Sequence, residues 1–215
     1  MNKCRWLMAG LIAVAVCAHG QVLFDENFDA PGIRWQGTAV PGAGGILVHT
    51  GTTAASHLIV PVQMPAETGR IKVTLTACLA KGGTLGVGFS PSTKISDTLM
   101  NNYGQPWMNL FGINGGAVYA GPYASEKAGE LEKNKLKMNE LQTITFELIR
   151  NGTAWSYRVL NAEMMIAEGP IQVSVDKLKY FFIQFRAVDK NSSKNESSID
   201  SVRLEVEVSQ PLISG

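Results

Sequence analysis

Hydrophobic and polar residues alternate along much of this chain. Between residues 69 and 80, the apolar side chains of Ile71, Val73, Leu75, Ala77 and Leu79 are interleaved with those of Lys72, Thr74, Thr76 and Cys78. Near the C-terminus, Val202, Leu204 and Val206 alternate with Arg203, Glu205 and Glu207, and Asp200 falls on the apolar side of the pattern. A period of two puts successive side chains on opposite faces of a strand, so both stretches are predicted to be β-strands with one face on a core.

Further short stretches carry strand signals and are separated by residues typical of turns. They cover residues 22–28, 45–49, 57–62, 84–90, 107–113, 117–120, 141–150, 153–160, 164–168 and 180–188. The pair Asn151-Gly152 predicts a tight hairpin, and Lys81-Gly82-Gly83 predicts another. Strands at this short and regular spacing predict an all-β protein, a two-sheet antiparallel sandwich.

The two ends of the chain are expected to lie together. The stretch 22–28 is predicted to pair with the last strand, residues 198–208. The polar loop 189–197 joins that strand to residues 180–188, and the two strands are predicted to be neighbours in one antiparallel sheet. Residues 121–138 are the one place where a helix is expected, with a solvated loop as the alternative.

Composition and charge narrow the function classes. The chain has 215 residues, of which 45% are hydrophobic, enough for one domain with a substantial core, over residues 21–215. The formal net charge is +1 and there is no basic stripe, so a nucleic-acid-binding surface is not expected.

The first twenty residues have the pattern of a secretory signal peptide. Lys3 and Arg5 precede an apolar run over residues 6–17, and small residues then predict cleavage between Gly20 and Gln21. The apolar run is shorter than the ~20 residues that a membrane-spanning helix needs. We therefore expect a secreted, periplasmic or cell-envelope protein. Cleavage leaves Cys78 as the one cysteine, which predicts a structural thiol and no internal disulfide.

Several motifs resemble a known superfamily. The segments FDENFD, GGTLGVGFS, TFELIRNGTAWSYRVLNA and SSIDSVRLEV are similar to secreted bacterial jelly-roll domains of the concanavalin A-like lectin/glucanase (laminin G-like) superfamily. They also resemble carbohydrate-binding modules with a galactose-binding-like jelly roll. Both resemblances imply a jelly roll whose terminal strands lie side by side.

The resemblance leaves enzymatic activity open, and the residues argue against it. Glycosidases of the superfamily carry an E-x-D-x-x-E strand, and this spacing does not occur in the chain. Glycoside hydrolysis needs two carboxylates flanking one bond. Glu205 and Glu207 have a suitable spacing, but an ordinary solvated strand face is the preferred interpretation of them. His49 and His57 stand in no metal-ligand or triad pattern.

Aromatic residues in the central region are candidates for binding a sugar, because sugar rings stack their C–H faces on exposed aromatic rings. The candidates are Tyr103, Trp107, Tyr119 and Tyr123. A place in the core is the alternative for Trp107. Trp155 and Tyr157 share a strand face with Val159 and are predicted to be core residues.

A polar strand face is the next candidate. Lys72, Thr74 and Thr76, together with Gly86, Gly88, Ser90, Gln184 and Arg186, make a concave polar groove with a glycine floor if their strands adjoin. The alternative is an ordinary solvent-facing sheet.

Two acidic residues fall on the apolar faces of the terminal strands. Glu26 and Asp200, with Asp29 nearby, have the oxygen ligands that a structural Ca²⁺ prefers. In the carbohydrate-binding modules that the chain resembles, such an ion commonly lies between the terminal strands. The alternative is that each carboxylate caps loop amides or pairs with a basic residue such as Arg34.

These observations predict a secreted, non-enzymatic β-sandwich that binds glycan or another surface polymer. A structural or adhesive envelope protein without a small ligand, and a divergent glycoside hydrolase, are the alternatives.

Overall fold

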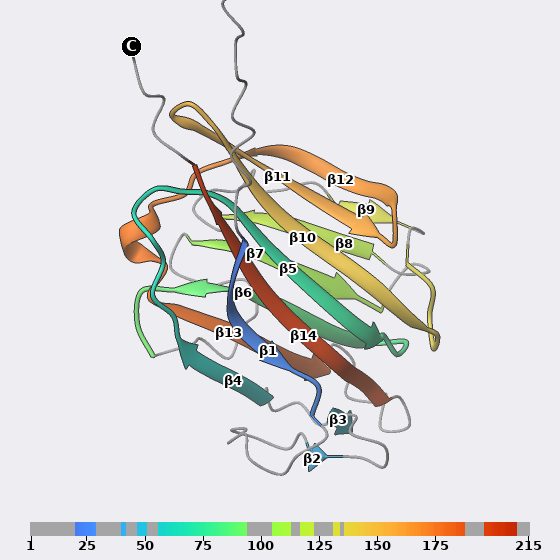
Figure 1. Ribbon diagram of the computed structural model, residues 1–215. Helices are drawn as coiled ribbons and strands as arrows, with labels where there is room; N and C mark the ends of the chain where they lie inside the picture. Colours follow the sequence, from blue (N-terminus) through green and yellow to red (C-terminus); the bar gives the residue numbers. More distant parts are fainter. Residues whose placement is uncertain are drawn as a thin grey trace, which may run out of the picture.

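A computed structural model describes residues 20–28, 40–41, 47–50, 56–93, 105–112, 117–122, 131–133, 136–187 and 196–209. In these ranges the chain forms two antiparallel sheets that face one another (Figure 1). The predicted all-β, two-sheet architecture is confirmed.

The larger sheet, sheet A, has eight strands among the described residues. Their order is β12-β11-β10-β5-β14-β3-β2, and β1 also pairs with β14. The bounds are β1 Gly20–Glu26, β2 Val40–Pro41, β3 Leu47–Thr50, β5 Thr68–Cys78, β10 Leu141–Asn151, β11 Ala154–Asn161, β12 Met164–Ile171 and β14 Glu196–Val208.

The smaller sheet, sheet B, has six strands in the order β4-β13-β6-β7-β8-β9. The bounds are β4 Ser56–Pro61, β6 Gly83–Ser90, β7 Pro106–Phe111, β8 Ala117–Pro122, β9 Leu131–Lys133 and β13 Tyr180–Ala187. A short 3₁₀ helix, η1, covers Val175–Lys177 between β12 and β13.

The predicted pairing of the chain's two ends is confirmed. β1 runs antiparallel to β14, with Phe24 opposite Leu204 and Glu26 opposite Val202, and the two ribbons lie side by side in Figure 1. β14 is long enough to pair with β1 over its C-terminal half and with β3 over its first residues, while β5 follows its other edge. The last strand is therefore central in sheet A, and not at its edge.

Two predicted hairpins are wrong, because their strands lie in different sheets. β5 and β6 flank Lys81-Gly82-Gly83, yet β5 belongs to sheet A and β6 to sheet B. The turn, closed by the Gly83 amide donating to the Ala80 carbonyl at 3.0 Å, carries the chain across the sandwich. β13 and β14 are separated in the same way. A local turn signal is the same for a hairpin and for a crossing between sheets, so the sequence did not distinguish them.

The core lies between the two sheets. β5 alternates as predicted, with Ile71, Val73 and Leu75 fully buried and the residues between them half-buried. Strands β6 and β13 differ: all of Gly83–Ser90 is buried, and so are residues 181–185. These strands are closed on both faces, which the alternating pattern did not predict for β13. Trp155 and Tyr157 belong to the core cluster, as predicted.

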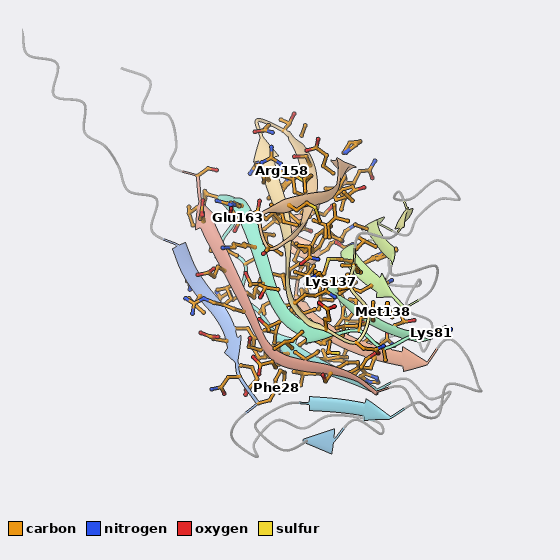
Figure 2. All side chains as sticks on the ribbon, turned by 90° about the vertical axis from the view of Figure 1, so that its right-hand side faces the viewer. Phe28, Lys81, Lys137, Met138, Arg158 and Glu163 are labelled. Carbon is orange, nitrogen blue, oxygen red and sulfur yellow. The ribbon has the colours of Figure 1, made fainter. Side chains whose placement is uncertain are left out.

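No helix is present in the described part of residues 121–138. Gly121 and Pro122 belong to β8 and Leu131–Lys133 forms strand β9 against it, so the helix prediction is wrong there; residues 123–130 and 134–135 lie outside the described ranges. Lys137 and Met138 lie beside Lys81 in Figure 2, where the Asn139 amide donates to the Leu79 carbonyl at 2.9 Å. Phe28 lies at the other end of the molecule from Arg158 (Figure 2). Among the described residues, no helix has the length and apolar character to cross a bilayer.

Candidate functional site

The face of sheet B that is turned away from sheet A carries two rows of residues, each in backbone register across five strands. The polar row consists of His57, Gln184, Gly86, Asn109 and Tyr119, which lie opposite one another on β4, β13, β6, β7 and β8. The aromatic row consists of Ile59, Phe182, Gly88, Trp107 and Gly121. Neighbouring strands are ~4.8 Å apart, so each row runs for about 19 Å across the sheet.

Glycines form the floor of this outer face. Gly86 lies between Gln184 and Asn109, and Gly88 lies beside Trp107. A methyl group on Gly88 would come within 2.6 Å of the Trp107 Cβ and 2.8 Å of the Pro106 carbonyl oxygen. Glycine is therefore the one residue type at position 88 that lets β7 lie this close to β6.

The polar groups of this face are held in fixed positions by burial. Gln184 and Asn109 are each 1% exposed, and Trp107 is fully buried. Buried amides persist where they find partners, and neither amide is without one. The Thr84 hydroxyl, one row further along β6, is buried and forms no hydrogen bond within the described residues. Hydrogen-bonding capacity therefore remains on the face.

The structure brings together part of the predicted groove. Gly86, Gly88, Ser90 and Gln184 share the outer face of sheet B as predicted, and Arg186 is on it by register, opposite Thr84. The prediction that Lys72, Thr74 and Thr76 belong to this groove is wrong, because β5 lies in sheet A. The crossing at residues 81–83 decides which sheet each of the two strands joins. The alternation of residues within the strands carries no information about this crossing.

The aromatic candidates are divided. Trp107 is buried but points away from the main core, so it fits neither of the predicted alternatives fully. Tyr119 belongs to the polar row by its backbone register. Tyr103 and Tyr123 lie outside the described residues. Sequence reasoning missed Asn109, although its spacing of two from Trp107 put both on one strand face.

Carboxylates are absent from the described side chains of the outer face of sheet B. These side chains are His57, Ile59, Pro61, Thr84, Ser90, Trp107, Asn109, Tyr180, Phe182 and Gln184, and Gln105 lies directly before β7. Amides, hydroxyls, an imidazole and aromatic rings remain. Such a set donates and accepts hydrogen bonds but does not supply the acid pair of a glycosidase.

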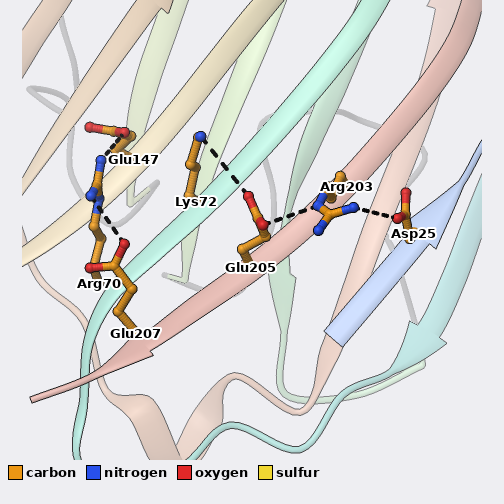
Figure 3. A network of polar contacts seen from close by, with 7 residues as sticks. All are labelled: Asp25, Arg70, Lys72, Glu147, Arg203, Glu205 and Glu207. Atoms are coloured by element: carbon orange, nitrogen blue, oxygen red, sulfur yellow. Dashed lines mark hydrogen bonds and ion pairs between the residues drawn. The ribbon is translucent and has the colours of Figure 1, made fainter. Parts of the chain in front are cut away.

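The outer face of sheet A is different, because its charges neutralise one another. One row of charged residues crosses five neighbouring strands, and the sign of the charge alternates along it. The row consists of Glu205 on β14, Lys72 on β5, Glu147 on β10, Arg158 on β11 and Glu168 on β12. Figure 3 shows the ion pairs on the β1 side of this row. Arg203 contacts Asp25 at 2.7 Å and Glu205 at 3.0 Å.

Arg70 joins two further carboxylates. Its guanidinium lies 2.5 Å from Glu147 and 3.1 Å from Glu207 (Figure 3). The hydrogen bond to Glu147 raises the pKa of Arg70 above its ordinary value, against the opposing effect of burial. Glu205 and Glu207, the acid pair considered from the sequence, are therefore both engaged in ion pairs on an exposed face. This arrangement supports the interpretation as an ordinary solvated face.

The proposed calcium ligands do not assemble among the described residues. The Glu26 carboxylate accepts a hydrogen bond from the Phe28 amide at 2.7 Å, which is the loop-capping alternative. Asp200 is not on the apolar face: a β-bulge between Ile199 and Ser201 leaves it half-buried, while Ile199 and Val202 both point into the core. No group of three metal-ligating side chains occurs in the described ranges, and Asp29 lies outside them.

Cys78 is a half-buried free thiol at the end of β5. Burial raises its pKa above the ordinary value, so the thiol stays protonated at neutral pH. This protonation agrees with the predicted structural role.

Neither a family model nor a curated protein sequence matches the chain. Solved structures do. The endo-1,3-β-glucanase of Streptomyces sioyaensis superposes with a TM-score of 0.63 at 14% identity, over 92% of this chain and 100% of that one. Arcelin-5, a lectin-like defence protein of Phaseolus vulgaris, gives 0.60 at 11% identity over 88% and 99%. The CBM2 module of the evolved Dit protein of Lactobacillus casei BL23 phage J-1 gives 0.58 at 12% identity over 89% and 98%. Together with the sheet topology, these matches show that the chain has the concanavalin A-like jelly-roll fold.

Proposed function

We propose that the protein is a non-enzymatic glycan-binding β-sandwich whose binding surface is the outer face of sheet B. The observation that carries the proposal is the polar row, in which His57, Gln184, Asn109 and Tyr119 lie in register around a glycine. Structures with the same fold include seed lectins, a carbohydrate recognition domain and a carbohydrate-binding module, which support this class of ligand.

The chemistry of the two rows suits a sugar polymer. Amide side chains both donate and accept hydrogen bonds, as the hydroxyls of a sugar do. Trp107 and Phe182, one row away, supply apolar surface for the C–H face of the ring. The row length of about 19 Å is sufficient for several sugar units in a line, as strand spacing sets it.

The same side chains support binding without hydrolysis. The described outer face of sheet B has hydrogen-bonding groups but no carboxylate, and hydrolysis of a glycoside needs two. Because a glucanase has this fold, a divergent hydrolase is the alternative that the test below must distinguish.

Access is part of the proposal. Gln184, Asn109, Phe182 and Trp107 are each at most 2% exposed, so they contact a sugar only when the approach to the outer face opens. A preorganised site that must open binds slowly relative to an open surface. We also propose that the protein acts outside the cytoplasm, because residues 1–20 have the pattern of an export signal.

The test is affinity electrophoresis of the full chain in gels that contain laminarin, xylan, galactomannan or alginate. We expect retardation by at least one polymer, and loss of it in Asn109→Leu and Gln184→Leu, which keep the approximate volume and remove the amide. Glu168→Gln, on the exposed face of sheet A, is the matched control and keeps the retardation.

Circular dichroism of each variant separates lost binding from lost folding. Absence of retardation by every polymer favours a structural or adhesive protein. Release of reducing sugar during incubation with any of the polymers identifies a hydrolase and contradicts the proposal.

A further inference from the structure

A second groove lies at the end of the sandwich where β10 and β11 are joined. Its volume is about 430 Å³, and its lining includes Met64, Arg150, Thr153, Trp155, Val175 and Asp176. Figure 1 shows the three contributing parts gathered at this end: the β10–β11 turn, η1 and the connection from β4 to β5. None of the lining residues belongs to the outer face of sheet B, so this end groove is a separate surface.

Arg150 occupies an unusual position for a charged residue. It lies opposite Trp155 across the β10–β11 pair and continues the inward face of β10 after Phe146 and Leu148. Phe146 and Leu148 are buried, whereas Arg150 is exposed. The guanidinium therefore stands on the core side of the sheet at the point where the sandwich opens. Its Nε atom donates to the Gly152 carbonyl at 2.9 Å, which fixes its direction.

Asp176 places an opposite charge on the same groove. It is an exposed residue of η1, and in the described part of the chain neither Asp176 nor Arg150 forms an ion pair. Beneath them lie the buried Trp155 and the half-buried Met64 and Val175. The groove thus combines an apolar floor with a strong donor and a strong acceptor that do not neutralise each other.

We propose that the end groove is a second saccharide site, which binds a single pyranose ring independently of the outer face of sheet B. The apolar floor receives the C–H face of the ring. Neighbouring hydroxyls accept hydrogen bonds from the Arg150 guanidinium and donate them to the Asp176 carboxylate, and such charge-assisted bonds are the stronger ones. The volume lies within the range of small-molecule sites.

Fluorine NMR of the full chain labelled with 5-fluorotryptophan tests the proposal. The Trp155 resonance, assigned from Trp155→Phe, is followed during titration with glucose, galactose, mannose, glucuronate and cellobiose. We expect a saturable shift with at least one sugar and a Kd in the millimolar range. Arg150→Gln and Asp176→Asn should each raise that Kd by about tenfold or more. Lys177→Gln, a change at the neighbouring exposed residue that does not line the groove, should leave it unchanged.

The outcomes divide cleanly. A Trp155 resonance that none of the sugars shifts, or that shifts with equal affinity in Arg150→Gln, overturns the proposal. A saturable shift with leucine or glycine and none with the sugars identifies an amino-acid site and overturns it as well. The Trp107 resonance reports on the outer face of sheet B in the same spectra. The two proposed sites therefore succeed or fail separately.

Discussion

Replacing Gly88 with alanine tests how the outer face of sheet B is built. The added methyl group would lie 2.6 Å from the Trp107 Cβ, 2.9 Å from the Trp107 Cα and 2.8 Å from the Pro106 carbonyl oxygen. Two of these contacts are with backbone atoms, so they are relieved only if β7 moves away from β6. Gly88→Ala should therefore destabilise the protein and displace the strand that carries both Trp107 and Asn109.

The magnitude follows from two opposing effects. Forcing extra volume into a packed site costs about 1–3 kcal/mol. Alanine lowers the conformational entropy of the unfolded chain, which returns about 0.4–1 kcal/mol. We expect a net loss of about 1–2 kcal/mol in the free energy of unfolding, measured by urea denaturation followed by circular dichroism and by tryptophan emission.

Gly169→Ala is the matched control. The three atoms nearest to its added methyl group all belong to the Tyr157 side chain, with the closest at 3.0 Å, and a side chain can shift by a few tenths of an ångström. We expect a loss of under about 1 kcal/mol for this variant, below the usual overpacking range. Equal stability of Gly88→Ala and the parent chain, with unchanged tryptophan emission, would refute the close-approach argument.

Three further predictions concern stability. Arg70→Met removes the partner of the nearly buried Glu147. Because Arg70 is about a third exposed, we expect the free energy of unfolding, measured by urea denaturation, to fall by only about 1–2 kcal/mol. The same fall in a Glu147→Met background would show that the two residues are not coupled. Leu75→Ala, at a fully buried position, should cost about 2–5 kcal/mol, and a change within error would contradict its place in the core. Burial raises the pKa of Cys78 above its ordinary value of 9.0, so between these values the unfolded chain loses a proton that the folded one keeps. Stability should fall as the pH rises through that window, and Cys78→Ser should remove this fall; an identical pH profile in the variant would contradict it.

The alternation of side chains carried most of the information about individual strands. Ile71, Val73 and Leu75 face the core as predicted, because a strand buried on one face needs a period of two. The Asn151-Gly152 turn joins β10 and β11 as predicted, since Gly152 has the positive φ of 63° that such a turn needs. The resemblance to jelly-roll domains implied the pairing of β1 with β14, which the register and the contact of Asp25 with Arg203 confirm.

What the sequence did not contain was the sheet to which several strands belong. The turn at residues 81–83 has hairpin residues but crosses between sheets, so Thr74 and Gly86 end on opposite sides of the molecule. The bulge that turns Asp200 out of the core arises from its register against β5, which is a property of the pair of strands and not of either one. For the same reason the polar row exists only in the folded protein: Gln184, Gly86 and Asn109 are far apart in the chain, and hydrogen bonding between strands places them side by side.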